Sequence, residues 1–361
     1  MRVLALYLPQ FHAFAENDEW WGKGYTEWTA VKRAKPLYPG HLEPRIPKGG
    51  DYYDLSDENA EALKRQAREA RDYGIYGFCF YHYYFTGKTL MEKPLSILLA
   101  HPEISLNYCL CWANESWTRT WYGLEEEVLM RQEYGSVGEW EEHFRHLLPF
   151  FRDPRHIRIG NRPMLHIYRP PDIRDRKEMF SYFDRRAREE GFDGIFTVGG
   201  RTAAFGRKED LGTDAAYFFE PGFTLKHDMG ALPTFVDQAR TALIRSCNRM
   251  TGSEILERRI PIERIYGSIA RREYAENEFP GIFPRWDNTP RRSYRGLVYT
   301  GASPEKFGGL LRILRDKVRG RENDFVYVNA YNEWGEGAML EADEAEGDAY
   351  LMQIKRVMEE G

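Results

Sequence analysis

Two glutamates near the end of the chain, Glu333 and Glu336, have the residue type and spacing for acid–base chemistry. Trp334 stands between them, and glycines flank the second, so a turn can bring both carboxyl groups into one cleft. Cleavage of a glycosidic bond needs one protonated carboxyl to help the leaving oxygen depart and one ionised carboxyl as nucleophile or base. Mutual repulsion and partial burial would separate the two pKa values in this sense. We interpret the two glutamates as a candidate catalytic pair; the alternative is two solvated loop carboxylates.

The elements that must position this pair alternate between short apolar runs and charged helical stretches. Candidate strands occupy residues 3–8, 74–83, 106–112, 163–168, 194–198, 215–219, 281–286 and 325–330. Candidate helices occupy residues 57–73, 138–151, 175–190, 304–318 and 348–360. This alternation is typical of α/β proteins. Eight strands in a chain of 361 residues predict one (β/α)8 TIM barrel, a single domain spanning residues 1–361.

A doubly wound open sheet is the alternative α/β architecture. It would need a Gly-rich phosphate-binding turn after an early strand, whereas the first strand is followed by Pro9, Gln10, Phe11 and His12. Two segments, residues 9–54 and 221–278, are long for simple strand-to-helix loops and are predicted insertions. The second contains a basic stretch, residues 240–249, which we interpret as a solvated helical face; a site for an anionic lipid or nucleotide diphosphate is the alternative.

The active site of a (β/α)8 barrel lies at the C-terminal ends of its strands, so polar and aromatic residues that end or follow strands are candidates for substrate binding. Those we single out, with two from the first insertion, are His12, Glu27, Trp28, His82, Tyr83, Trp112, Asn114, Glu115, Trp117, Arg119, His166, Tyr168, Glu220, Arg285, Trp286, Asp287, Tyr331, Asn332 and Trp334. Trp112 and Trp117 could instead cover the barrel end, and His82 and His166 could be core histidines. The agreement of many such groups at one rim supports the prediction.

Composition favours a glycan partner over other classes. Aromatic residues make up 15% of the chain, and their flat faces stack on sugars as well as fill cores. A net charge of −5 lacks the basic footprint of a nucleic-acid binder. No apolar run is long enough for a transmembrane helix. The N-terminus has the pattern of a strand rather than of a signal peptide, so a cytoplasmic location is expected.

The cysteines and histidines give little indication of a metal site. Cys109 and Cys111 would share one face of a strand, but no histidine or further cysteine lies close to them in sequence. His12 and His82 could in principle bind zinc with a carboxylate, yet the chain has no HExxH motif and these two histidines are far apart in sequence. We therefore expect reduced core thiols, no metal and no organic cofactor.

Six stretches together resemble a known family. They are residues 5–12 (ALYLPQFH), 24–28 (GYTEW), 77–84 (GFCFYHYY), 112–119 (WANESWTR), 283–291 (FPRWDNTPR) and 332–337 (NEWGEG). The chain resembles the WbsX-like group related to glycoside hydrolase family 99, the endo-α-mannosidase family. Members of the group are described as lipopolysaccharide-biosynthesis proteins or glycosyltransferases, and the hydrolase relatives are retaining enzymes on a (β/α)8 barrel.

The resemblance implies a role for each glutamate. Glu333 matches the residue that acts on the substrate 2-hydroxyl to give a 1,2-anhydro-sugar intermediate. Glu336 matches the general acid/base that protonates the leaving oxygen and then activates water. No metal or cofactor is implied. The hydrolase motif has a histidine where this chain has Gly335, a departure that argues against a mannoside substrate and leaves the carboxylate pair intact.

Three hypotheses follow for function. The first is a retaining glycosidase that cuts an α-linked oligosaccharide or polysaccharide, with sugar subsites built from Trp20, Trp21, Trp28, Trp117 and Trp286. The second is a glycosyltransferase of lipopolysaccharide, O-antigen or other surface-polysaccharide assembly, although Asp51 and Asp54 are a weak substitute for an Asp-x-Asp metal site. The third is a glycan-binding module without catalysis. The sequence does not indicate the sugar or the oligomeric state.

Overall fold

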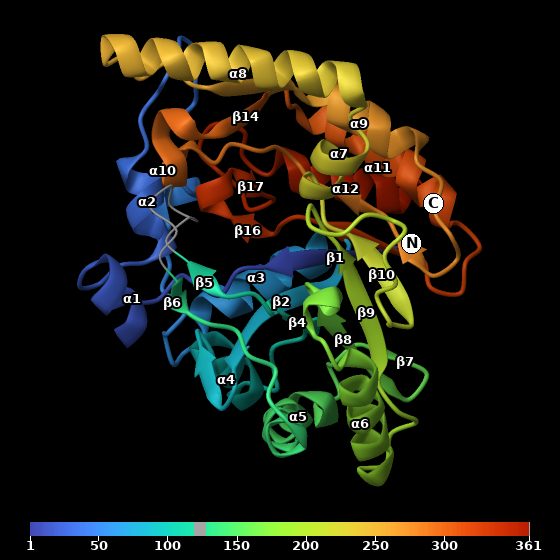
Figure 1. Ribbon diagram of the computed structural model, residues 1–361. Coiled ribbons are helices and arrows are strands. Elements are labelled where there is room, and N and C mark those ends of the chain that lie inside the picture. Colours follow the sequence, from blue (N-terminus) through green and yellow to red (C-terminus); the bar gives the residue numbers. More distant parts are fainter. Residues whose placement is uncertain (119–127, 361) are drawn as a thin grey trace.

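A nearly closed parallel β-barrel surrounded by helices forms the body of the protein (Figure 1). The computed structural model describes residues 1–118 and 128–360. In spatial order, the barrel strands are β12 (Glu278–Phe279), β10 (Ala215–Phe218), β9 (Phe196–Arg201), β8 (Arg162–Ile167), β4 (Asn107–Trp112), β2 (Ile75–Phe85), β1 (Arg2–Tyr7), β15 (Phe325–Val328) and β13 (Gly281–Ile282). The α/β barrel prediction is thereby confirmed.

The barrel closes through the short segment 278–282. Pro280 separates β12 from β13 because it has no backbone N–H to donate, but its carbonyl accepts a hydrogen bond from the Tyr327 amide at 2.8 Å. β12 pairs with β10 on one side, and β13 pairs with β15 on the other. Gly281 is required for this approach, because a Cβ there would lie 1.9 Å from the Phe218 carbonyl oxygen. The strand predicted at residues 281–286 begins at Gly281 as expected but ends at Ile282, and the separate strand β12 precedes it.

The helices outside the barrel bury one apolar stripe each. They are α3 (Glu61–Asp72), α4 (Lys93–Ala100), α5 (Val137–Arg152), α6 (Arg176–Glu189), α9 (Ile262–Arg271), α11 (Pro304–Val318) and α12 (Ala349–Glu359). In α3, for example, the buried side chains recur at Leu63, Gln66, Ala67 and Ala70, which is the spacing of one helical face. All five predicted helices are present; the first begins at Glu61 rather than at residue 57.

The two predicted insertions contain helices and a strand; among them, helical structure around residues 240–249 was expected from the sequence and lies within the helix Ala231–Thr251. Residues 9–54 contain α1 (Ala15–Trp21) and α2 (Glu27–Arg33), and residues 221–278 contain α7 (Gly222–His227), α8 (Ala231–Thr251), β11 (Arg258–Pro261) and α9. β11 pairs with β14 (Leu297–Thr300) in a small parallel sheet outside the barrel. Figure 1 shows α8 across the top of the view. None of the described helices combines the length and apolarity needed to cross a bilayer.

The remaining short elements lie at the barrel ends and between helices. They are β3 (Lys88–Leu90), β5 (Trp117–Thr118), β6 (Val128–Met130), β7 (Arg158–Ile159), β16 (Asn332–Glu333), β17 (Ala338–Met339) and α10 (Thr289–Arg292), with single 3-10 turns at Lys48–Gly50, Pro170–Asp172, Ser293–Arg295 and Trp334–Glu336. Among them, β16, β17, α10 and the turns Ser293–Arg295 and Trp334–Glu336 are the ones that build the site.

Candidate active site

A cavity of about 470 Å³ opens where the barrel strands end. Its walls include Tyr81 and Tyr83 from the end of β2, Tyr168 after β8, Phe219 after β10 and Trp286 after β13. The volume lies within the range of roughly 300–1,000 Å³ that is typical of small-molecule sites. The cavity is thus at the end of the barrel where (β/α)8 enzymes place their active sites.

Six residues expected from the sequence line this cavity. They are Tyr83, Glu115, Tyr168, Trp286, Glu333 and Glu336. The aromatic members supply flat faces and the three glutamates supply acid–base groups, so the cavity has the composition of a site for a polyhydroxylated ring.

A short hairpin after β15 carries Glu333 and Glu336. β16 pairs antiparallel with β17, and a single 3-10 turn, Trp334–Glu336, connects them. The side chain of Asn332 anchors the hairpin to β1, because its Oδ1 accepts from the Leu8 amide at 2.7 Å and its Nδ2 donates to the Leu8 carbonyl at 2.9 Å. The indole of Trp334 is buried and donates to Glu341 at 2.7 Å. Both neighbours of Glu333 are thus fixed, which leaves its carboxyl group at the cavity wall.

One guanidinium joins three carboxylates at this wall. Arg291 donates from Nη2 to Glu333 at 2.9 Å and from Nη1 to Glu336 at 2.8 Å. Its Nε donates to Glu27 at 2.8 Å, and Glu27 is fully buried. The side chain of Glu333 is 6% exposed and that of Glu336 is 21% exposed. Glu336 is therefore the carboxyl of the pair that an incoming group reaches more easily.

Gly335 makes room for the Glu27–Arg291 pair. A Cβ at this position would lie 1.7 Å from Glu27 Oε1 and 2.7 Å from Arg291 Nε. Any larger residue would displace the ion pair that holds both catalytic candidates. The glycine that departs from the hydrolase motif is therefore a steric requirement of the Glu27–Arg291 contact.

Burial controls the protonation of the pair. It raises the pKa of Glu333 to about 8, with the charges of Glu336 and Glu27 adding to the rise and Arg291 opposing it. Burial also raises the pKa of Glu336, again against Arg291. Three clustered carboxylates face one bonded guanidinium, so near neutral pH the pair retains a proton. A singly protonated pair is the state that acid–base cleavage of a glycoside requires.

Several residues expected to contact substrate do not line the cavity and instead pack against the residues that do. Trp28 packs against Trp334 with ring centroids 5.3 Å apart and donates to the Tyr53 carbonyl. Asp287 accepts from the Thr289 hydroxyl, and its amide donates to the Glu336 carbonyl at 2.7 Å. These residues fix the position of the hairpin. The buried Tyr331 donates instead to Glu69, under the barrel end.

Strand alternation directs His82 away from the cavity. Tyr81 and Tyr83 line the cavity, so His82 between them faces outward, where its Nε2 lies 3.1 Å from that of His143 on α5. His166 lies inside the barrel with its Nε2 2.7 Å from the Tyr327 hydroxyl. Burial lowers the pKa of both histidines, so they are neutral side chains of the interior.

The other expected contacts hold loops and helices together. His12 Nδ1 lies 3.0 Å from the Pro9 carbonyl oxygen, and Trp112 donates to the Tyr84 carbonyl. The side chain of Asn114 bonds both the amide and the carbonyl of Arg169.

Trp117 packs on Tyr83 and on Trp20. Glu220 pairs with Arg272, and Arg285 pairs with Glu346. Of the tryptophans expected as sugar subsites, Trp286 lines the cavity and Trp20, Trp21, Trp28 and Trp117 do not. Arg119 lies outside the described residues.

Sequence reasoning missed a basic side of the cavity. Arg258, Arg291, Arg292, Arg295 and Tyr299 also line it. Arg291 follows the seventh predicted strand, at the rim where the site was expected, but it was not among the residues singled out for substrate binding. Arg258 lies in the second insertion and Tyr299 on β14, and only the pairing of β11 with β14 brings them to the barrel end.

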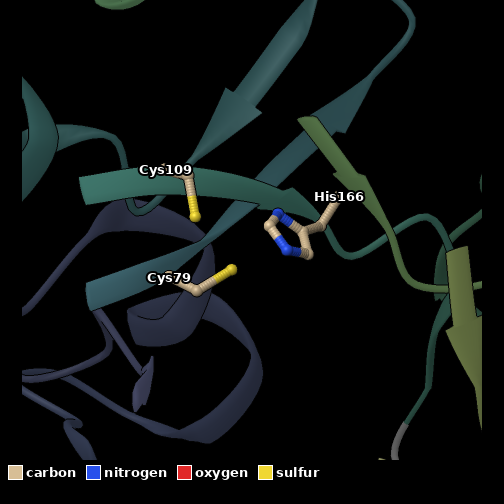
Figure 2. Close-up of side chains that lie close together, drawn as sticks. All are labelled: Cys79, Cys109 and His166. Atoms are coloured by element: carbon tan, nitrogen blue, oxygen red, sulfur yellow. The ribbon is translucent and has the colours of Figure 1, made fainter. Parts of the chain in front are cut away.

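Two groups of side chains have metal-ligand chemistry. Cys79, Cys109 and His166 lie together inside the barrel, where they point toward one another from β2, β4 and β8 (Figure 2). This group offers three donors, one fewer than structural zinc sites use, and burial raises the pKa of the Cys79 thiol. In the second group, His41 binds Asp287 at 2.5 Å beside Glu43, whose pKa burial raises to about 8. Neither group lies on the cavity wall.

A sequence profile described as "Glycosyltransferase WbsX" matches residues 3–354. Two proteins of Xanthomonas campestris pv. campestris, both named "Uncharacterized protein WxcX", are 37% and 36% identical over 361 residues, which is 99% of this chain. The chain spans about half the length of these relatives, 49% in each case.

Solved structures share the fold at low identity. The GH99 endo-alpha-mannosidase from Bacteroides thetaiotaomicron has a TM-score of 0.55 at 12% identity, with 99% of this chain and 97% of that chain covered. A structure described as "Glycoside hydrolase-like protein" has a TM-score of 0.58 at 13% identity, with 99% and 93% covered.

Proposed function

The chain belongs to the WbsX glycosyltransferase family, and on that premise we propose that it is a carbohydrate-active enzyme that cleaves an α-linked glycan with Glu333 and Glu336. The observation that carries the proposal is the bonding of both carboxyl groups to one arginine at the wall of a barrel-end cavity. Arg291 thereby holds the two groups near each other, and burial raises the pKa of both.

In the proposed reaction Glu336, the more exposed carboxyl of the pair, takes up the proton and is the acid, which leaves Glu333 ionised. Glu336 donates this proton to the leaving glycosidic oxygen as the bond from that oxygen to C1 breaks. Glu333 accepts the proton of the 2-hydroxyl, and O2 forms a bond to C1, which gives a 1,2-anhydro sugar. Glu336 then removes a proton from water, and the water oxygen attacks C1. The C1–O2 bond opens as O2 recovers its proton from Glu333, so the anomeric configuration is retained after two inversions.

The other residues of the site orient these groups. Arg291 fixes both carboxyl groups and offsets part of their charge. Tyr81, Tyr83, Tyr168 and Trp286 provide the aromatic walls for a sugar ring.

The same chemistry serves transfer when a sugar hydroxyl replaces water in the second step. The description of the matching family as glycosyltransferase favours this second candidate. With a glycan as donor, hydrolysis needs the glycan alone, whereas transfer needs an added acceptor sugar. Tight binding of a nucleotide-sugar without hydrolysis of any glycan would favour a glycosyltransferase that uses an activated donor.

The test incubates the purified protein with a panel of α-linked glycans and follows the anomers of the products by NMR. We expect retained configuration and a loss of about 10²-fold or more in E336Q, the size of a lost general acid. An aryl glycoside whose leaving group needs no proton should recover much of the first step in E336Q. Products of inverted configuration, or wild-type rates in E336Q, would contradict the assignment.

A further inference from the structure

Both acidic and basic side chains line the cavity. Glu115, Glu333 and Glu336 lie on it, and so do the cations Arg258, Arg292 and Arg295. Arg291 is already committed to the glutamates, at distances of 2.8–2.9 Å. The charge of Arg292 also acts on Glu336, whose pKa it lowers against the effect of burial. Among the described residues, Arg258 and Arg295 are the cations of the cavity that have no such role toward the glutamates.

A defined piece of structure presents the basic side. In the parallel pair β11–β14, Arg258 lies opposite Leu297, and Tyr299 lies two residues further along β14. Residues two apart on a strand point to the same face, so Leu297 and Tyr299 both reach the cavity, together with Arg258. Arg295 comes from the 3-10 turn just before β14. Arg259, the neighbour of Arg258, lies over the ring of Tyr38 instead.

Four groups on this side, Arg258, Arg295, Tyr299 and Trp286, have no acceptor or carboxylate partner in the part of the chain that the structure describes. Within residues 1–118 and 128–360, Arg258 and Arg295 form no ion pair with a carboxylate, whereas Arg245 and Arg272 pair with Glu257 and Glu220. The Tyr299 hydroxyl and the Trp286 Nε1 are buried and have no hydrogen-bond partner among the described residues.

A buried polar group left without a partner costs about 1–3 kcal/mol. Tyr299 is only 3% exposed, and the charge of Arg258 acts on its hydroxyl. This cost falls on the Tyr299 hydroxyl and the Trp286 indole, whereas Arg258 is half-buried and Arg295 is exposed. An acceptor that carries negative charge would satisfy both neutral donors and would also pair with the two cations, which a neutral sugar hydroxyl cannot do.

We infer that Arg258, Arg295, Tyr299 and Trp286 form a subsite for an oxyanion carried by the glycan, a carboxylate or a phosphate group. Guanidinium groups suit both, because their N–H groups match the spacing of two oxygens on one anion. The substrate class is thus an acidic glycan, with its charged group next to the bond that is cleaved. This inference rests on the proposed function, because that function is what makes the bound molecule a glycan.

Binding to the whole chain tests the inference without any turnover. Isothermal titration compares methyl α-glucoside, methyl α-glucuronide and glucose 6-phosphate as probes, with inorganic phosphate as the probe without a sugar. The variants are R258Q, R258Q/R295Q and Y299F, and the control matched to R258Q is R259Q, which removes one charge from the neighbouring position on β11, where Arg259 lies over Tyr38.

We expect at least one charged sugar to bind the wild type about 10-fold or more tightly than the neutral glucoside. The preference should disappear in R258Q/R295Q, weaken in R258Q and in Y299F, and persist in R259Q. Preference for the glucuronide identifies a carboxylate, and preference for the sugar phosphate or for phosphate alone identifies a phosphoryl group. Equal binding of charged and neutral probes, or a preference that survives in R258Q/R295Q, overturns the inference.

The readout also separates this inference from the proposed function. If the protein prefers anionic probes but cleaves no glycan, the anion subsite is supported and the proposed glycan-cleaving activity is contradicted. If it cleaves neutral glycans but shows no preference for charged probes, the activity is supported and the anion subsite is contradicted.

Discussion

Replacement of Arg291 by methionine tests the charge balance of the site most directly. The arginine is the bonded cation of Glu27, Glu333 and Glu336, and both Arg291 and Glu27 are buried. Methionine keeps a side chain of similar length but removes the charge. Removing one partner of a buried ion pair costs about 3–5 kcal/mol, because the remaining charges stay buried without compensation. We expect R291M to lose free energy of unfolding of that size near neutral pH.

The loss should depend on pH in a defined direction. Without Arg291, which lowers the pKa of Glu333 and of Glu336, both pKa values rise further and the folded variant binds at least one additional proton. A carboxyl whose pKa is higher in the folded state than in the unfolded state stabilises the protein at low pH and loses that contribution as the pH rises. Each extra proton changes the free energy of unfolding by about 1.4 kcal/mol per pH unit.

Between about pH 7 and about pH 5, the deficit of R291M should therefore shrink, by up to about 2.7 kcal/mol for one proton. Urea denaturation of the wild type and R291M at both pH values measures this difference. R312M is the control, because Arg312 pairs with Glu360 on the surface and its removal should have a small effect that is alike at both pH values. A deficit of R291M that is equal at both pH values would refute the reasoning that the three carboxylates share one counter-charge.

Three further predictions concern the surroundings of the pair. The charge of Glu27 raises the pKa of both Glu333 and Glu336, so E27Q should move both limbs of the pH–rate profile to lower pH, and an unmoved profile would contradict this. G335A should destabilise the protein by about 1–3 kcal/mol, because its Cβ meets the Glu27–Arg291 pair, and G335A/E27A should lose less than the two single losses together. A thiol reagent should modify Cys247 and spare the buried Cys79, Cys109 and Cys111 in the native protein; reaction of a second thiol before unfolding would show that the barrel core is accessible.

The sequence determined the periodic part of this protein. The apolar strands and the amphipathic helices between them can be recognised locally, because a buried strand needs a short run of apolar residues and a helix with one buried face needs them at regular spacing. The strands of this kind are β1, β2, β4, β8, β10 and β15. The stretch NEWGEG at residues 332–337 likewise marked its two glutamates, because residues so close in sequence must share one turn.

Tertiary structure alone decided which groups meet these glutamates. Glu27 and Arg291 are 264 positions apart in the chain, and no local pattern pairs them. His82 had the type of a site residue, yet the alternation of β2 turns it outward, whereas Tyr81 beside it faces the cavity. Arg258 and Tyr299 reach the cavity only because β11 and β14 pair outside the barrel. Side-chain type and spacing determine local conformation, but the packing of distant segments determines which charges lie within a few ångströms, and electrostatic interactions depend on that distance.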